Sequence, residues 1–200
     1  MSLTLAPLAT HHRLDGFDCG KPTLNAWLLR HAAQAQGSGS ARTFVALDGP
    51  LESQLDNQLD NQPDSPRVAG YFSLTVGQID AADASDRVRK GMGGYPIPVV
   101  ILARLAVSVP DQGRGIGAGL LREAIARTLQ LAEIAGVRAM LTHPLDDEAA
   151  RFYRRFGFEA SPIREQQLLL LLKDARRAAA RALGVRALGV REPGAPGDDH

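Results

Sequence analysis

The segment Gln112–Gly117, with the sequence Gln-Gly-Arg-Gly-Ile-Gly, lies past the middle of this 200-residue chain. The run Pro98–Val109 before it is almost continuously apolar, broken by Arg104, which predicts a central strand covered on both faces. After it, apolar residues recur at the helical period over Leu120–Ala132, and Gly136 stands where a helix ends. The segment is therefore expected to connect a strand to the N-terminus of a helix.

Such a turn favours a pyrophosphate ligand, because the first backbone N–H groups of a helix lack partners and converge on one place. Glycines let the main chain approach phosphate oxygens closely, and an arginine adds positive charge. A dinucleotide-binding fold is disfavoured, since its fingerprint lies in a first strand–helix–strand unit and not past mid-chain behind a hairpin. A tight turn without a ligand is the alternative. The predicted phosphate-binding residues are Gln112, Gly113, Arg114, Gly115, Ile116 and Gly117.

The same loop matches the pattern Q/R-x-x-G-x-G/A of the GNAT superfamily of N-acetyltransferases, which the chain resembles over about Phe17–Leu172. Residues 149–158, with the sequence AARFYRRFGF, match a later helix and strand of that family. The resemblance implies the GNAT α/β fold, a central mixed sheet of the α+β kind flanked by helices. It implies acetyl-CoA as co-substrate and no metal. It also implies that the strand before the loop bulges away from its neighbour and binds the cofactor through Leu105, Ala106 and Val107.

A narrower likeness, to the GNAT toxins of bacterial toxin–antitoxin modules, comes from five short segments. It implies acetylation of the α-amine of the amino acid on charged tRNA, which inhibits translation. The implied partners are a ribbon-helix-helix antitoxin, operator DNA bound only through that antitoxin, and a second copy in a homodimer. The segments are Phe17–Gly20, Gly70–Phe72, Pro96–Val99, Arg104–Val107 and Ala132–Arg138.

Tyr153 is the predicted catalytic residue, because the family match places it beside the thioester. A phenol with a reference pKa of about 10 can donate a proton as the sulfur leaves. A core aromatic is the alternative, since Phe152 and Phe156 share the region. The amine needs no strong base, because an α-amine has a reference pKa of about 7.7–8.0, and no carboxylate pair stands at a convincing position. His143, next to Pro144, is a rival base.

Four basic residues are candidates for contact with tRNA. Arg87, Arg89 and Lys90 resemble a tRNA-facing stretch of the toxins, with a solvated loop as the alternative. Arg104 interrupts an apolar strand and is expected either to meet a tRNA phosphate or to pair with a buried acid. Two other functions stay open: acetylation of a small amine or protein N-terminus, and non-catalytic binding of acyl-CoA or nucleic acid.

Charge is unevenly distributed along the chain, although the formal net charge is only +1. Five acids between Asp48 and Asp64 have no Lys or Arg among them, and the charge would be +6 without them. We expect an acetyltransferase domain over residues 1–172, with a low-complexity acidic loop at 48–67 that repeats Leu-Asp-Asn-Gln. Residues 173–200 are expected to form an Arg/Ala-rich helix and tail, whose arginines either contact nucleic acid or are solvated.

The single cysteine, Cys19, excludes an internal disulfide and is expected to be a small core residue. It forms no recognisable metal set with His11 and His12. The longest leucine run, Leu168–Leu172, is far shorter than the roughly 20 residues of a membrane span, and the N-terminus lacks signal-peptide features, so we expect a cytoplasmic protein without a membrane anchor. Periodicity predicts further strands at Thr43–Leu47, Val68–Val76, Val137–Thr142 and Leu168–Leu172, and helices at Pro22–Gln36 and Asp146–Phe156.

Overall fold

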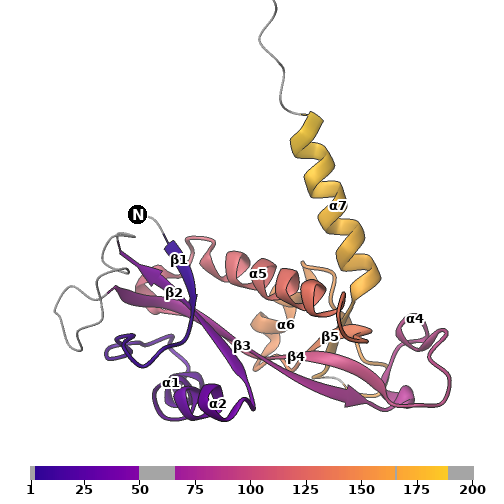
Figure 1. Ribbon diagram of the computed structural model, residues 1–200, viewed down its shortest axis with the longest axis horizontal. Helices are drawn as coiled ribbons and strands as arrows, with labels where there is room; N and C mark the ends of the chain where they lie inside the picture. The colour runs from indigo at the N-terminus through magenta and orange to yellow at the C-terminus, as the bar shows by residue number, and fades with distance from the viewer. Residues whose placement is uncertain (1–2, 50–65, 165, 189–200) are drawn as a thin grey trace, which may run out of the picture.

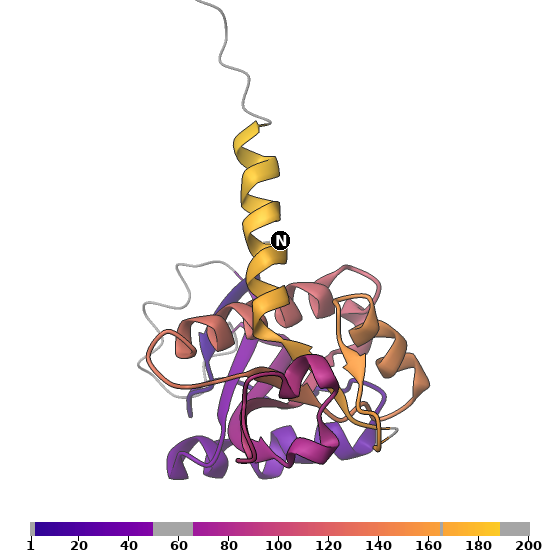
Figure 2. The ribbon, with the colours of Figure 1, turned by 90° about the vertical axis from the view of Figure 1, so that its right-hand side faces the viewer.

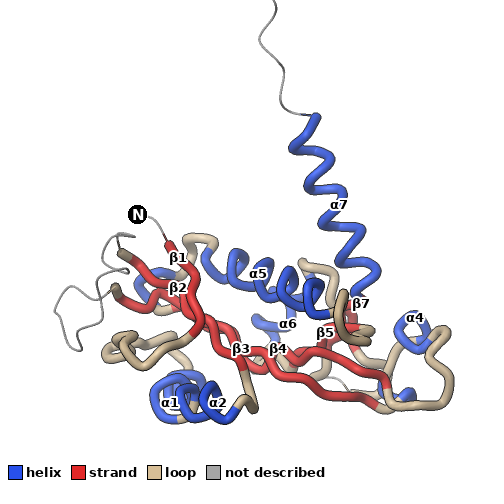
Figure 3. Tube along the Cα trace, in the orientation of Figure 1, coloured by secondary structure: helices blue, strands red, loops and turns tan. Residues whose placement is uncertain are grey.

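The computed structural model describes residues 3–49, 66–164 and 166–188. Most of the predicted acidic loop at 48–67 and the tail beyond residue 188 lie outside the described residues. Seven strands form one mixed sheet in the order β1-β2-β3-β4-β5-β7-β6, which confirms the expected fold class (Figures 1 and 3). The strands are β1 (Leu3–Pro7), β2 (Arg42–Asp48), β3 (Arg67–Ile79), β4 (Ile97–Val107), β5 (Ala139–Thr142), β6 (Glu159–Ala160) and β7 (Leu168–Leu171).

Strand direction divides the sheet into an antiparallel half and a second half entered through one parallel pair. β1 to β4 form an antiparallel meander, in which β2 and β3 are the predicted hairpin. β4 and β5 are parallel, as expected for strands joined by a crossover helix. β7 then pairs antiparallel with both β5 and β6.

Helices cover both faces of the sheet, and each face has its own apolar core. On one face, Leu120 and Leu121 of α5 pack with Phe72 and Met140 of the strands. On the other face, Leu28 of α1 packs against β2 and β3. Figures 1 and 2 show α7 extending away from the body. The helices are α1 (Pro22–Arg30), α2 (Ala32–Ser38), α4 (Asp86–Arg89), α5 (Ile116–Leu131), α6 (Asp147–Arg154) and α7 (Leu172–Leu188).

The prediction of one helix over Pro22–Gln36 is wrong, because the chain breaks into α1 and α2 at His31. His31 has φ −122° and ψ −26°, outside the helical region, and both Leu28 before it and Ala32 after it are buried against the sheet. Periodicity recorded the buried positions correctly but could not show that the helix axis turns between them. Strand β1 and the one-turn helix α4 were not predicted, whereas β6 directly follows the residues that match a strand of the family.

No helix within the described part of the chain combines the length and the apolar character needed to cross a bilayer.

Substitution of Gly70 tests how closely α5 lies on the sheet. A Cβ atom at Gly70 would lie 2.9 Å from both the Ala106 carbonyl oxygen and Leu120 Cδ1. The carbonyl oxygen belongs to the backbone of β4 and cannot move aside as a flexible side chain can. We expect Gly70→Ala to lower the free energy of unfolding by about 1–3 kcal/mol, measured by urea denaturation. The matched control is Gly37→Ala in α2, where no atom lies within 4 Å and better helix propensity gives no change or a gain of up to about 1 kcal/mol. Equal stability of Gly70→Ala and the wild type would contradict this packing.

Candidate active site

The site begins where β4 and β5 separate. β5 pairs with β4 only as far as Thr142 opposite Leu102, whereas β4 continues to Val107 along β3. The register with β3 passes from Leu74–Leu102 to Ser73–Arg104, so Ala103 is an extra residue and forms a β-bulge. A bulge bends a strand and increases its twist. The bulge and the splayed strands implied by the resemblance are therefore present in this chain.

A cavity of about 520 Å³ occupies the space beside the splayed end of β4. Four predicted residues from separate segments meet there: Arg104 on β4, Gln112 on the loop, His143 after β5 and Tyr153 on α6. Leu105, Ala106, Val107 and Gly117 line the same cavity. The rest of the glycine loop lies elsewhere, since Arg114, Gly115 and Ile116 line a separate hollow of about 340 Å³ beside β1, and Gly113 lines neither.

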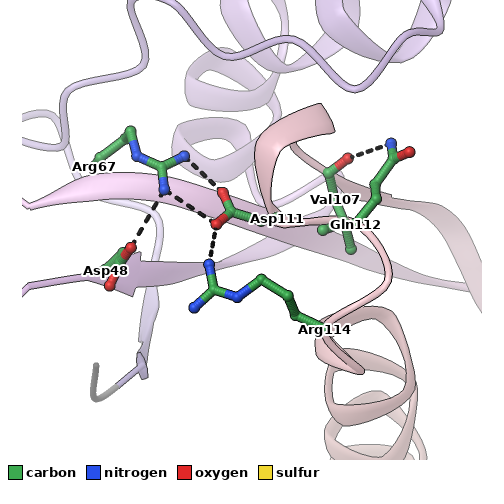
Figure 4. A network of polar contacts seen from close by, with 6 residues as sticks. All are labelled: Asp48, Arg67, Val107, Asp111, Gln112 and Arg114. Carbon is green, nitrogen blue, oxygen red and sulfur yellow. Dashed lines mark hydrogen bonds and ion pairs between the residues drawn. The ribbon is translucent and has the colours of Figure 1, made fainter.

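The loop Gln112–Gly117 has the backbone that its glycines predict. Gly113 and Gly115 have φ values of +74° and +79°, in the left-handed region that glycine adopts without a steric penalty. Among the described residues no side chain caps α5, so the N–H groups of its first turn are available to an anion. Gln112 fixes the loop to the end of β4, since its Nε2 donates to the Val107 carbonyl at 3.0 Å (Figure 4).

Tyr153 is both a core aromatic and a lining residue of the cavity, so the two alternatives are not exclusive. Its side chain is only 6% exposed and packs against the rings of Phe152 and Phe158. Burial raises the pKa of Tyr153 to about 12, although a hydrogen bond with the Thr142 side chain acts in the opposite direction. The phenol is therefore protonated at neutral pH and can donate a proton or a hydrogen bond, but it cannot act as a base.

α6 is held at its start by two contacts of Asp146. One carboxylate oxygen accepts the backbone N–H of Ala149 at 2.9 Å, which is an N-cap. The other accepts from Lys21 Nζ at 2.8 Å, and both partners of this ion pair line the cavity. The ion pair joins the loop before α1 to the helix that carries Tyr153. A separation of 125 residues left no sequence signal for it.

Arg104 lines the cavity with its guanidinium over the Trp27 ring, 5.5 Å from the ring centroid. Its Nη1 donates to the Ala103 carbonyl at 2.6 Å. Among the described residues no carboxylate forms an ion pair with it, so the alternative of a buried acid partner has no support here. The cation is held by an aromatic face and a carbonyl, and no acid within the described ranges neutralises its charge.

Arg87, Arg89 and Lys90 are not brought to the cavity. They lie on or beside α4, which precedes the start of β4, whereas the cavity lies at the other end of that strand. Arg87 pairs with Glu159 and Asp174, and Arg89 pairs with Asp86. Their positive charge is thus partly neutralised within the protein.

Several lining residues were missed by sequence reasoning, namely Lys21, Leu24, Asp146, Glu148 and Arg155. Cys19 also lines the cavity, and it is buried as predicted for a small core residue. Burial raises the pKa of the Cys19 thiol, which is therefore not a reactive thiolate. In the described ranges no three His, Cys, Asp or Glu side chains are grouped to hold a metal ion.

Comparison with known proteins identifies the family of the chain. Residues 69–160 match the acetyltransferase (GNAT) domain. A tRNA-acetylating toxin of Mycobacterium tuberculosis is 42% identical over 164 residues, which cover 82% of this chain and 88% of that protein. The chain belongs to the GNAT acetyltransferases, in the branch that contains this toxin.

Two solved structures share the fold. AtaT complexed with acetyl-methionyl-tRNAfMet has a TM-score of 0.76 and 25% identity, over 89% of this chain and 99% of that chain. An AtaT variant bound to the C-terminus of the antitoxin AtaR and acetyl-CoA has a TM-score of 0.70 and 23% identity, over 88% of this chain and 98% of that chain. The second likeness concerns the fold alone.

The burial of Tyr153 can be tested by titration of its phenol. We expect the wild type and Tyr153→Phe to gain the same tyrosinate absorbance as the pH rises to about 11, because the pKa of Tyr153 is raised to about 12 and its phenol stays protonated. The spectra are recorded directly after a rapid pH jump, before the protein unfolds. A phenol that titrates near pH 10 and is lost in Tyr153→Phe would show that the hydroxyl is solvated.

Proposed function

We propose that the protein transfers the acetyl group of acetyl-CoA to the α-amine of the amino acid on charged tRNA, and thereby inhibits translation. The observation that carries the proposal is the cavity beside the splayed strands, where Tyr153 supplies a buried proton donor and Arg104 a cation without a carboxylate partner among the described residues. The 42% identity to a tRNA-acetylating toxin supports the choice of substrate class.

The residues around the cavity fit acetyl-CoA. In the part of the chain that the structure describes, no strand pairs with the side of β4 over Leu105–Val107 that faces away from β3, so its backbone groups can bind a pantetheine arm. The N-terminus of α5, with left-handed glycines at 113 and 115, suits a pyrophosphate. Arg114 adds charge there, and Leu105, Ala106, Val107, Gln112, Gly113, Gly115, Ile116 and Gly117 complete the proposed cofactor site. When bound, acetyl-CoA supplies the acetyl thioester.

The acceptor amine needs little help to become a nucleophile. With a reference pKa of about 7.7–8.0, a sizeable fraction of it is neutral at physiological pH. His143 is exposed at the cavity and is the alternative proton acceptor. The backbone N–H groups of Leu105 and Val107 face away from β3, because those of the alternate residues Ala106 and Ser108 face it, and they are placed to stabilise negative charge on the thioester carbonyl oxygen.

Tyr153 acts on the leaving sulfur. It keeps its proton at Oη through neutral pH, because burial raises its pKa to about 12. A thiol has a reference pKa of about 8.5, so the phenol is the weaker acid and the proton stays mostly on the phenol oxygen. Its contribution is therefore a hydrogen bond that stabilises the departing thiolate, rather than complete loss of the Tyr153 proton.

The proposal extends to the contacts with tRNA, the domain bounds and the protein partners. Arg104, held against Trp27, contacts a phosphate at the acceptor end of the tRNA, and Arg87, Arg89 and Lys90 are left for contacts far from the reacting amine. Residues 1–172 form the acetyltransferase domain and residues 173–200 an appended helix and tail. The protein works in the cytoplasm as a homodimer, and a ribbon-helix-helix antitoxin covers the cavity that Arg104 lines and carries the pair to operator DNA.

Labelled acetyl-CoA and a pool of charged tRNA test the reaction. We expect label on charged tRNA, none on uncharged tRNA, and release of the label with the amino acid on deacylation. Tyr153→Phe should lower kcat by about 10²–10³-fold, the range for loss of one positioned hydrogen-bond donor to a developing negative charge, while acetyl-CoA still binds. Transfer to free amines or peptide N-termini alone would replace the tRNA substrate with these acceptors. Cofactor binding without transfer to any acceptor would make the protein a binding module.

Salt dependence tests Arg104. The logarithm of the affinity for charged tRNA falls linearly with the logarithm of salt concentration, and we expect Arg104→Gln to reduce that slope by about 0.7–0.9, one phosphate contact. Arg164→Gln is the control, because Arg164 pairs with Asp83 and does not line the cavity. An unchanged slope in Arg104→Gln would assign this guanidinium a structural role.

A further inference from the structure

Two arginines share one buried carboxylate at the base of the proposed cofactor loop (Figure 4). Asp111, directly before Gln112, has a side chain that is only 1% exposed. Arg67, the first residue of β3, donates to both of its oxygens, at 2.6 Å from Nη1 and 3.2 Å from Nη2. Arg114 donates to the oxygen at the 3.2 Å contact. The hydrogen bond from Arg67 is the largest cause that lowers the pKa of Asp111, so the carboxylate is charged at neutral pH.

The two arginines differ in what else surrounds them. Nη2 of Arg67, which donates to Asp111, also donates to Asp48 at 3.3 Å, and Asp48 and Arg67 face each other in the β2–β3 register. Arg114 lies inside the loop that is proposed to bind the cofactor phosphates, and it lines the hollow at the start of α5. Arg67 is therefore held by strands, whereas Arg114 belongs to the proposed ligand site.

A phosphate that binds at this loop competes with Asp111 for Arg114. A buried carboxylate that loses its counter-ion is strongly destabilised, so Arg114 can turn toward a phosphate only if another cation stays on Asp111. The bidentate contact from Arg67 meets that requirement, because it engages both carboxylate oxygens without Arg114.

We propose that Arg67 is a positioning residue for acetyl-CoA binding: it keeps Asp111 paired, so that the Arg114 guanidinium can move to a cofactor phosphate. The inference rests on the proposed function for its ligand. In the absence of Arg67, the contact from Arg114 to Asp111 remains, and Arg114 is retained there. Affinity for the phosphate part of acetyl-CoA then falls, although Arg67 itself does not touch the ligand.

The test is a double-mutant cycle on the dissociation constant of acetyl-CoA, measured by calorimetry with the full chain. We expect Arg67→Gln and Arg114→Gln each to weaken binding about tenfold, the loss of one charge-assisted contact. The double variant should bind no more weakly than Arg114→Gln, because Arg67 acts through Arg114. Arg67→Lys should recover part of the affinity. Asp48→Asn, which leaves the contacts to Asp111 intact, is the matched control and should bind as the wild type does.

The proposal would be overturned if Arg67→Gln bound acetyl-CoA as tightly as the wild type. It would also be overturned if Arg67→Gln weakened binding by the same factor in the wild type and in the Arg114→Gln variant. S-acetylpantetheine, which has no phosphates, separates positioning from misfolding: its affinity should be equal in wild type and Arg67→Gln, and an equal loss for both ligands would also overturn it. In turnover, Arg67→Gln should raise KM for acetyl-CoA and leave kcat unchanged. A wild type that binds acetyl-CoA but acetylates no charged tRNA would refute the proposed function, while the binding cycle still decides this inference.

Discussion

β5 stops pairing with β4 at Leu102, and much of the site follows from that loss of a neighbour. Backbone N–H and C=O groups in a sheet interior need partners, and beyond this point β4 offers one row of them to something other than a strand. The extra residue Ala103 turns the strand away, and Gln112 fills one position by binding the Val107 carbonyl. The other positions are the ones that an extended, amide-containing ligand can use.

Two polar groups at the cavity, Thr142 and Asp146, are bound to other parts of the protein. Thr142 donates to the Leu102 carbonyl at 3.0 Å, at the last pair before the strands separate. Asp146 caps α6 and binds Lys21, so the helix that carries Tyr153 is fixed to the opposite wall. Such fixed contacts hold a proton donor in place before any ligand arrives, which lowers the reorganisation needed during the reaction.

Local patterns in the sequence predicted the elements that carry the site, but they could not predict the contacts between them. A strand, a turn and the start of a helix were predicted from the run Pro98–Val109 and the glycines at 113 and 115, because the backbone conformation of such segments depends on nearby residues. Family motifs, rather than periodicity, identified Tyr153. The partners of Asp111 and of Lys21 come from distant segments, and nothing in a single sequence records them.

The clusters of basic residues in the sequence did not reveal which acids they pair with in the structure. Arg87 and Arg89 read as a basic patch in the sequence, but in the structure each of them pairs with acids, some of them from β6 and α7. Arg104, by contrast, was recognised from its position within an apolar strand, where a charge is costly and therefore needs a specific neighbour. That neighbour is the ring of Trp27.

The ion pair between Asp48 and Arg67 ties together the last residue of β2 and the first residue of β3. Because the hairpin is closed there, the number of residues between the two strands matters little for stability: in general, doubling the length of a loop costs only about 0.6 kcal/mol. The connection between these two residues is therefore a suitable place for an engineered insertion, such as a fluorescent reporter or an affinity tag. Such an insertion would leave the sheet undisturbed, provided that Asp48 and Arg67 are kept.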